Sequence, residues 1–412
     1  MSILRTLVLM LVALVCFDAS ASELNIKMMI SSGNQRKVFV KIIKKFKKEN
    51  PNIKVVNREA EQEKYKQQFE SWLKQEKGDS DVLFWFAGAK LNHFVKKGWV
   101  RSLNDLWKRE KLAQVFTEGS RTTVLAPDNH EYGIPLSYYQ WGYYYRKSLF
   151  KKHGLNEPKT WDEFLKVCDT LKKNGVTPIT LGSKWRWTAA AYFDYFNLRL
   201  NGLDYHRKLM DGKISYKDKG VQSVFNHWKK LVDNGYFIKN HNKLDWRGSL
   251  PYLYRKSAGL LLMGNFLIPK VPKNVINDLG FFRFPQMNPS IPYYEEAPMD
   301  ILLIPKNAKN VKNAEKFLLY MSSKEVQYEL NSQMGMISPN KHTQKSKDIF
   351  IQAGREILEE AKGLSGFYDR DTSPEMFNPG MDAMIEFMKN TDGMNKVLEK
   401  MEKARTDAFK VN

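Results

Sequence analysis

Aromatic side chains gathered in short stretches are the residues of this chain best suited to binding a small molecule. The sequence contains 10 tryptophans and 19 tyrosines, more than core packing usually requires. The densest stretch runs from Tyr138 to Tyr145 and includes Tyr139 and Trp141. Aromatic planes with a few convergent carboxylates, amides and guanidinium groups suit a ligand with flat C–H faces and hydroxyl edges. The tryptophan-rich stretches therefore favour an organic ligand.

No enzyme motif accompanies these aromatic residues. The sequence lacks the G-x-S-x-G, H-E-x-x-H and G-x-x-x-x-G-K-[ST] patterns of hydrolases, metalloproteases and nucleotide-binding enzymes. Glu295 and Glu296 are neighbours, so in an extended segment they point to opposite faces and cannot flank a glycosidic bond at about 5–9.5 Å. We therefore predict that the protein is not an enzyme and has no catalytic residue, no cofactor and no metal site.

Strands and helices alternate over the first part of the chain. Apolar runs predict strands at 23–30, 53–57 and 81–86, and apolar residues at helical spacing predict helices at 34–49 and 65–76. This order predicts a mostly parallel sheet with helices on both faces. Ligands bind beyond the carboxyl ends of the strands in such sheets, which points to 31–33 and to 85–87.

The same alternation occurs a second time and is followed by a helical tail. Strands are predicted at 177–181, 258–263 and 299–304, and helices at 160–173, 188–200 and 221–232. A capping box, Thr160-Trp161-Asp162-Glu163, opens the first of these helices. A chain of 412 residues is too long for one compact core. We therefore predict an α/β protein with two lobes.

The first 21 residues have the pattern of a secretory signal peptide. Arg5 supplies a positive charge, residues 6–17 are apolar, and Ala19-Ser20-Ala21 is a small-residue cleavage site. The apolar run is shorter than the roughly 20 residues that span a bilayer. We expect cleavage after Ala21 and a periplasmic protein. Cys16 leaves open a lipid-anchored form, although a lipobox requires a small residue where Val15 stands.

The charge and cysteine content narrow the function further. The formal net charge is +21, but the lysines are dispersed along helix faces, as in 37–48, which is typical of a solvated surface. We therefore predict no nucleic-acid partner, and leave open a role of the charge near an anionic solute or membrane surface. Only Cys168 follows the signal peptide, so no intramolecular disulfide can form and we expect Cys168 to be a buried core residue.

Several motifs resemble one protein family in their order and spacing. They are Tyr132-Gly133-Ile134-Pro135, Tyr144 to Phe150, Pro158 to Glu163, Lys256 to Gly259, Met263 to Phe266, Phe282 to Pro285, Asn313 to Leu318 and Met334 to Pro339. Together they resemble the extracellular solute-binding proteins of bacterial ABC importers, in the carbohydrate-binding group typified by maltose-binding protein. Arg146 stands where that family usually has asparagine, which is a mild departure.

The resemblance implies a two-lobed periplasmic-binding-protein fold with the ligand cleft between the lobes. It places the N-terminal lobe at 22–135 and 299–339, and the C-terminal lobe at 136–298 and 340–412. The chain would cross between lobes near Pro135, Met299 and Pro339. The implied function is that of a monomer that captures a sugar or oligosaccharide and delivers it to a membrane permease.

Nine residues are candidates for contact with this solute. Trp85 follows the third strand, Tyr139 and Trp141 share one face after the first crossing, and Trp187 stands near a helix N-terminus. Asp194 in that helix could accept hydrogen bonds from hydroxyls, with a lobe-internal role as its alternative. The resemblance adds residues from later loops and from the helical tail. The predicted ligand-binding set is Trp85, Tyr139, Trp141, Trp187, Asp194, Asn265, Phe266, Glu296 and Phe377.

Other functions stay open at this point. Paired tyrosines such as Tyr138 and Tyr139 also occur in ferric-ion binders, and a polyamine binder would need several inward carboxylates beside its aromatic residues. An anion is a further alternative solute. A secreted enzyme that acts on glycosides is the remaining alternative. The tryptophan-rich loops favour an organic solute over a ferric ion.

Overall fold

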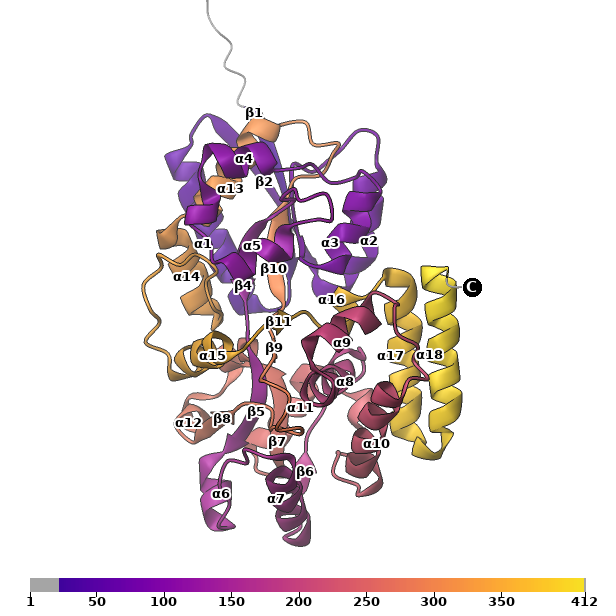
Figure 1. The fold of residues 1–412 in the computed structure, drawn as a ribbon. Coiled ribbons are helices and arrows are strands. Elements are labelled where there is room, and N and C mark those ends of the chain that lie inside the picture. Colours follow the sequence, from indigo (N-terminus) through magenta and orange to yellow (C-terminus); the bar gives the residue numbers. More distant parts are fainter. Residues whose placement is uncertain (1–21, 411–412) are drawn as a thin grey trace, which may run out of the picture.

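The computed structural model describes residues 22–410 and has two lobes joined by several chain crossings (Figure 1). This confirms the predicted two-lobed α/β fold. The predicted signal peptide, with Arg5 and Cys16, lies outside the described residues. Within 22–410, no helix combines the length and the apolar character needed to cross a membrane.

The first lobe is built on a five-stranded sheet with the order β2-β1-β3-β10-β4. Its strands are β1 (Ser22–Ile30), β2 (Ile53–Glu61), β3 (Val82–Phe86), β4 (Ile134–Tyr138) and β10 (Met299–Leu303). Its helices are α1 (Gly33–Glu49), α2 (Gln62–Lys74), α3 (Ala89–Lys96), α4 (Asn104–Arg109), η1 (Leu112–Gln114), α5 (Glu118–Val124), α13 (Val311–Ser322) and α14 (Lys324–Met334).

The second lobe is built on a four-stranded sheet with the order β6-β7-β5-β8. Its strands are β5 (Trp141–Arg146), β6 (Thr177–Ile179), β7 (Ala258–Gly264) and β8 (Leu279–Phe282). Its helices are α6 (Lys147–Lys152), α7 (Trp161–Lys173), α8 (Trp187–Leu200), α9 (Gly202–Met210), α10 (Lys219–Asp233), η2 (His241–Lys243), α11 (Trp246–Tyr254), η3 (Asn265–Lys270), α12 (Lys273–Ile276), α17 (Pro374–Lys389), η4 (Thr391–Gly393) and α18 (Met394–Phe409).

Each sheet contains one strand that runs against the others, so most strands of each sheet point in the same direction, as predicted. β10 pairs antiparallel with both β3 and β4, and β5 pairs antiparallel with both β7 and β8. β1 is parallel to β2 and β3, and β6 is parallel to β7. β5 and β10 are the strands that enter a lobe directly from the other one. They therefore start at the cleft and run away from it, whereas β1, β3 and β7 run toward it.

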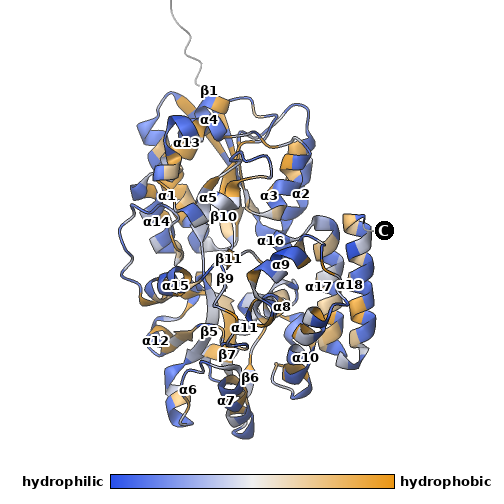
Figure 2. Ribbon diagram, viewed as in Figure 1, coloured by the Kyte–Doolittle hydropathy of each residue, from blue (hydrophilic) through white to orange (hydrophobic). Residues whose placement is uncertain are grey.

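The local sequence explains why these elements form. The five residues of β3 are all buried, as expected of a strand covered by helices on both faces. Helix α7 begins with the predicted capping box, in which Glu163 N–H donates to the Thr160 hydroxyl and the Glu163 carboxylate accepts from Thr160 N–H. The helices turn polar faces outward and apolar faces toward the sheets (Figure 2). Cys168 on α7 is fully buried and free.

Several segments connect the lobes near the middle of the molecule. β4 lies in the first sheet and β5 in the second, so the first change of sheet falls between Tyr138 and Trp141. Tyr138 exchanges two backbone hydrogen bonds with Ile337, at 3.0 and 2.9 Å, which brings the segment after α14 beside this crossing. β9 (Glu295–Glu296) pairs with β11 (Leu364–Ser365), and α15 (Ile349–Glu360) and α16 (Tyr368–Asp371) flank them (Figure 1).

Candidate ligand-binding site

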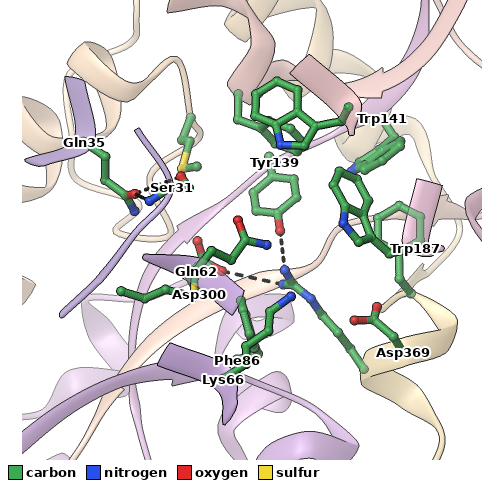
Figure 3. Close-up of a pocket in the computed structure, with 16 residues that line it drawn as sticks. Ser31, Gln35, Gln62, Lys66, Phe86, Tyr139, Trp141, Trp187, Asp300 and Asp369 are labelled. Atoms are coloured by element: carbon green, nitrogen blue, oxygen red, sulfur yellow. Dashed lines mark hydrogen bonds and ion pairs between the residues drawn. The ribbon is translucent and has the colours of Figure 1, made fainter. Parts of the chain in front are cut away.

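A pocket lies between the two lobes and takes residues from both of them. The space between its walls, including the part open to solvent, is about 720 Å³. The first lobe contributes mostly polar side chains and the second lobe mostly aromatic ones (Figure 3). The lining residues are Met29, Ser31, Gln35, Gln62, Lys66, Phe86, Tyr139, Trp141, Trp187, Trp246, Phe266, Asp300, Met336, Phe367, Asp369 and Arg370.

The start of α1 forms one polar edge of the pocket. Ser32 caps this helix by accepting a hydrogen bond from Gln35 N–H. The Gln35 side chain reaches back, and its Oε1 accepts from the Ser31 N–H at 2.5 Å and from the Ser31 hydroxyl at 2.8 Å. These bonds fix the loop after β1 and hold Ser31 and Gln35 at the pocket wall.

Arg370 is a charged group of the pocket wall that contacts residues from both lobes. Its Nη2 donates to the Tyr139 hydroxyl at 2.5 Å, its Nη1 lies 3.6 Å from Asp300 Oδ1, and its guanidinium carbon lies 4.2 Å from the centre of the Phe86 ring. Arg370 Nη1 and Asp300 Oδ1 are buried without a hydrogen-bond partner among the described residues. Both can therefore bond to a hydroxyl group of a ligand.

Burial also changes the protonation of Asp300. It raises the pKa of the carboxyl to about 6, although Arg370 and Lys66 act in the opposite direction. Asp300 is thus ionised at neutral pH and takes up a proton in mildly acidic solution.

Aromatic rings from the second lobe form the opposite wall. Trp141 lies edge-to-face with Trp187, with ring centres 5.8 Å apart, and Phe266 lies edge-to-face with Tyr139 and Trp246, at 5.2 Å from each. Trp187 and Phe266 are partly exposed, whereas the other three are buried. This wall can offer apolar planes to the C–H face of a ligand.

A strained residue places Trp187 on this wall. Arg186, directly before it, has a φ of 67°, which is unusual for a residue other than glycine. Its side chain is held on α17 by Asp382 at 2.7 Å and Asn378 at 3.2 Å. Backbone strain of this kind is found where a structure holds a functional residue in a fixed orientation.

The two lobes touch across the pocket. Arg247 on α11 of the second lobe donates a hydrogen bond to the Ser31 carbonyl of the first lobe. Lys90 on α3 of the first lobe lies 2.9 Å from Asp369 on α16. Burial lowers the pKa of Lys90 to about 8. Burial also acts to raise the pKa of Asp369, but the nearby charges of Lys90 and Arg370 outweigh burial, and the pKa of Asp369 is lowered. This ion pair is therefore charged at neutral pH.

Four of the nine predicted residues line this pocket, and the structure brings them together. They are Tyr139, Trp141, Trp187 and Phe266. Asn265, beside Phe266, does not line it and is fully buried. Gly264 allows Phe266 to fold back over the end of β7, because a Cβ there would lie 2.4 Å from the ring.

The structure places Trp85 in the core of the first lobe rather than at the pocket. Its ring stacks on Phe69 of α2 at 3.5 Å and contacts Phe94 of α3 at 5.8 Å. The next residue, Phe86, lines the pocket instead. Neighbouring strand residues point to opposite faces, so the predicted position was one residue away from the one that faces the cleft.

Asp194, Glu296 and Phe377 also lie outside the pocket. Asp194 and Glu296 are fully buried in the second lobe, and Asp194 Oδ2 accepts a hydrogen bond from Tyr368 N–H at 2.9 Å. Phe377 is partly buried on α17, with the Lys90 ammonium 4.9 Å from its ring centre. The helical tail does reach the pocket, but through Phe367, Asp369 and Arg370.

Sequence reasoning missed several lining residues on both lobes. Gln62 and Lys66 lie on the first turns of α2, and Trp246 begins α11 after its N-cap, Asp245. The capping residues before these helices were the only available signal that their N-termini reach a cleft. No pattern in the sequence singled out Asp369 or Arg370.

Comparisons with known proteins agree on one family. Residues 31–328 match the family model described as bacterial extracellular solute-binding protein. An uncharacterized ABC transporter extracellular-binding protein of Pyrococcus horikoshii is 25% identical over 391 residues, which cover 91% of this chain and 85% of that protein. The multiple sugar-binding protein of Streptococcus mutans is 28% identical over 198 residues, which cover 47% of each chain.

Solved structures have the same fold over nearly the whole chain. The bacterial solute receptor AcbH, described as preferring β-D-galactopyranose, has a TM-score of 0.88 and 25% identity, with 94% of this chain and 100% of that chain covered. A chitin oligosaccharide binding protein has a TM-score of 0.83 and 22% identity, with 95% and 100% covered. At 22% identity, the similarity to the chitin oligosaccharide binding protein indicates a shared fold only.

Proposed function

Because this chain belongs to the bacterial extracellular solute-binding protein family, we propose that it captures a sugar for an ABC importer. The pocket between the lobes is the capture site. The observation that carries the proposal is the opposition of an aromatic wall to a polar wall on the two sides of this pocket. A sugar presents a C–H face to the first and hydroxyl groups to the second.

A neutral sugar fits the charges of the pocket. The two carboxylates on its wall face cations, since Asp300 lies 3.6 Å from Arg370 and Asp369 lies 2.9 Å from Lys90. Lys66 lies 3.1 Å from Glu63, outside the pocket. A charged solute would have to disturb these pairs, whereas neutral hydroxyl groups can form hydrogen bonds with their atoms while the pairs stay in place. The sugar-binding relatives support the same solute class.

Other solutes fit the pocket less well. Tyr139 is the one phenol among its lining residues, and its hydroxyl is bonded to Arg370. A ferric site would need several oxygen ligands around one ion. A polyamine would need carboxylates free of cations. An enzyme on glycosides is also disfavoured, because Glu295 and Glu296 are fully buried outside the pocket.

The rest of the proposal concerns how the protein works in the cell. Residues 1–21 direct export and are removed, and the monomer collects its solute in the periplasm. It then docks on a membrane permease, and neither nucleic acid nor catalysis has a part in this cycle. The lobes, 22–135 with 299–339 and 136–298 with 340–412, close on the solute by hinge motion at the crossings. Cross-lobe contacts such as Arg247 with Ser31 then stabilise the closed form.

Calorimetric titration with a panel of mono-, di- and oligosaccharides tests the proposed function. At least one neutral sugar should bind, and galactose and other hexoses are the first to try. Trp187→Ala should then weaken binding by about 2 kcal/mol, or roughly 30-fold, because an aromatic anchor in a pocket is lost.

Trp85→Ala is the matched control for this experiment. Trp85 is a buried tryptophan outside the pocket, so its removal should lower the melting temperature and leave the affinity of the folded protein nearly unchanged. Equal losses of affinity in the two variants would contradict the proposed pocket. Binding of an organic acid or a polyamine, with no sugar bound, would contradict the proposed solute class.

A further inference from the structure

A cluster of three polar side chains is buried inside the second lobe, behind the pocket wall. Asp194 on α8, His206 on α9 and Glu296 on β9 are each 0% exposed. One ligand-type atom from each of them lies within 4.8 Å of the other two. None of the three lines the sugar pocket, so the proposed function gives them no role.

Their polar atoms lack partners to an unusual degree. Asp194 Oδ1, His206 Nε2 and both carboxylate oxygens of Glu296 are buried without a hydrogen bond among the described residues. Buried polar groups are nearly always paired, and each unpaired one costs free energy. Four unpaired atoms in one place indicate a missing partner that can serve all of them.

Charge points to a cation as that partner. The Asp194 and Glu296 carboxyl groups are both fully buried, and Arg199, the nearby cation, is bonded to Glu295 at 2.7 Å. An ionised carboxylate is rarely buried unless it is paired or coordinates a metal. His206 is also fully buried, and its Nε2 has no hydrogen-bond partner among the described residues, so this nitrogen is placed to act as a ligand.

We propose that Asp194, His206 and Glu296 bind one divalent transition-metal ion, and that Zn²⁺ suits them best. An imidazole nitrogen, one aspartate oxygen and a bidentate Glu296 supply four donor atoms, the usual number for zinc. Tetrahedral zinc bonds of about 2.0–2.2 Å place the ligand atoms about 3.3–3.6 Å apart. Because the three ligand atoms lie within 4.8 Å of one another, the side chains must move together by up to about 1.5 Å to bind zinc.

The neighbours of the cluster can orient its ligands. His206 Nδ1 lies 3.1 Å from the side-chain amide of Asn197. In the structure Asn197 Nδ2 faces the ring and Asn197 Oδ1 accepts a hydrogen bond from Asn201 Nδ2 at 2.8 Å. The amide must therefore turn over for its oxygen to accept the Nδ1–H and leave the Nε2 lone pair free for the metal. Asp194 uses its other oxygen to hold Tyr368 N–H at 2.9 Å. The ion would thereby fasten α8, α9 and β9 to α16, the helix that carries Asp369 and Arg370 into the sugar pocket.

Metal analysis of the purified full-length mature protein tests this proposal. The protein is stripped with a chelator, dialysed against Zn²⁺, Mn²⁺ or Ca²⁺ in separate arms, and measured by mass spectrometry and thermal melting. We expect one zinc ion per chain and a higher melting temperature with zinc. His206→Asn and Glu296→Gln should each weaken zinc binding by roughly 100-fold or more.

His241→Asn is the control for the loss of a buried histidine outside the cluster. His241 is also buried but bonds to the Ser183 hydroxyl at 2.7 Å, outside the cluster, so this variant should keep its zinc. Melting of all variants without metal shows that they fold. The proposal is overturned if the stripped wild-type protein takes up no zinc, if zinc uptake survives both substitutions, or if only Ca²⁺ binds. The sugar titration above is independent of this result.

Discussion

Asp300 offers a quantitative test of the electrostatics of the pocket. This residue is 5% exposed, and burial raises its pKa to about 6 from an ordinary value of 3.8. The folded protein therefore binds this proton more tightly than the unfolded chain does. Stability is gained below the folded pKa and is lost as the pH rises from about 4 through about 6. The shift of about two units corresponds to about 3 kcal/mol.

The variant Asp300→Asn cannot take part in this titration. The difference in free energy of unfolding between Asp300→Asn and wild type should therefore increase by about 3 kcal/mol in favour of the variant between pH 4 and pH 7. Because Arg370 Nη1 lies 3.6 Å from Asp300 and Lys66 also faces it, the variant also loses one attraction to these cations. This loss makes the variant less stable at neutral pH by a constant amount. The difference in free energy of unfolding still shifts in favour of the variant as the pH rises.

Urea unfolding of both proteins at a series of pH values measures this difference. Taking the difference cancels the contributions of the other titrating groups, which both proteins share. Asp204→Asn, at a carboxylate whose side chain is 82% exposed, controls for the replacement itself. A difference that stays constant within about 0.5 kcal/mol between pH 4 and pH 7 would refute the reasoning, since that is the size of an ordinary surface effect.

Two further substitutions separate closure from folding. Arg247→Ala removes the hydrogen bond to the Ser31 carbonyl across the cleft. It should raise the dissociation rate of the solute roughly fivefold in stopped-flow measurements, equivalent to about 1 kcal/mol, and leave the association rate unchanged; an unchanged dissociation rate would argue against closure at this contact. Thr160→Ala removes the capping box of α7, far from the pocket. It should lower the free energy of unfolding by about 1 kcal/mol, and a change in sugar affinity would contradict its structural role.

The elements of the fold could be predicted because their sequence patterns are local. Helix α1 has apolar residues at helical spacing and was expected at 34–49, one residue from its observed start. The capping box at Thr160 fixed the start of α7. The direction of β5 and β10 was harder to predict, since it depends on which lobe each strand enters from. Nothing within either strand contains that information.

The pocket residues were harder to predict because burial removes the usual signal. Every residue of β3 is buried, so the strand has no polar face from which to tell that Phe86, and not Trp85, points to the cleft. Helix α8 is buried almost all round, and its sequence could not tell whether Asp194 faces the pocket or the lobe interior. Arg370 reaches Tyr139 over a separation of 231 residues, a contact that no local pattern encodes.

The reversed strands explain why this pocket combines residues from so many segments. In strands that run toward the cleft, the residues at or just beyond the strand's end line the pocket, as Phe86 of β3 and Phe266 after β7 do. The two strands that run away deliver their first residues, Trp141 from β5 and Asp300 from β10. Because both reversed strands directly follow a crossing, Trp141 and Asp300 lie where we propose that the lobes pivot. A solute that contacts them therefore touches the hinge as well as the walls, and its binding energy can favour the closed arrangement directly.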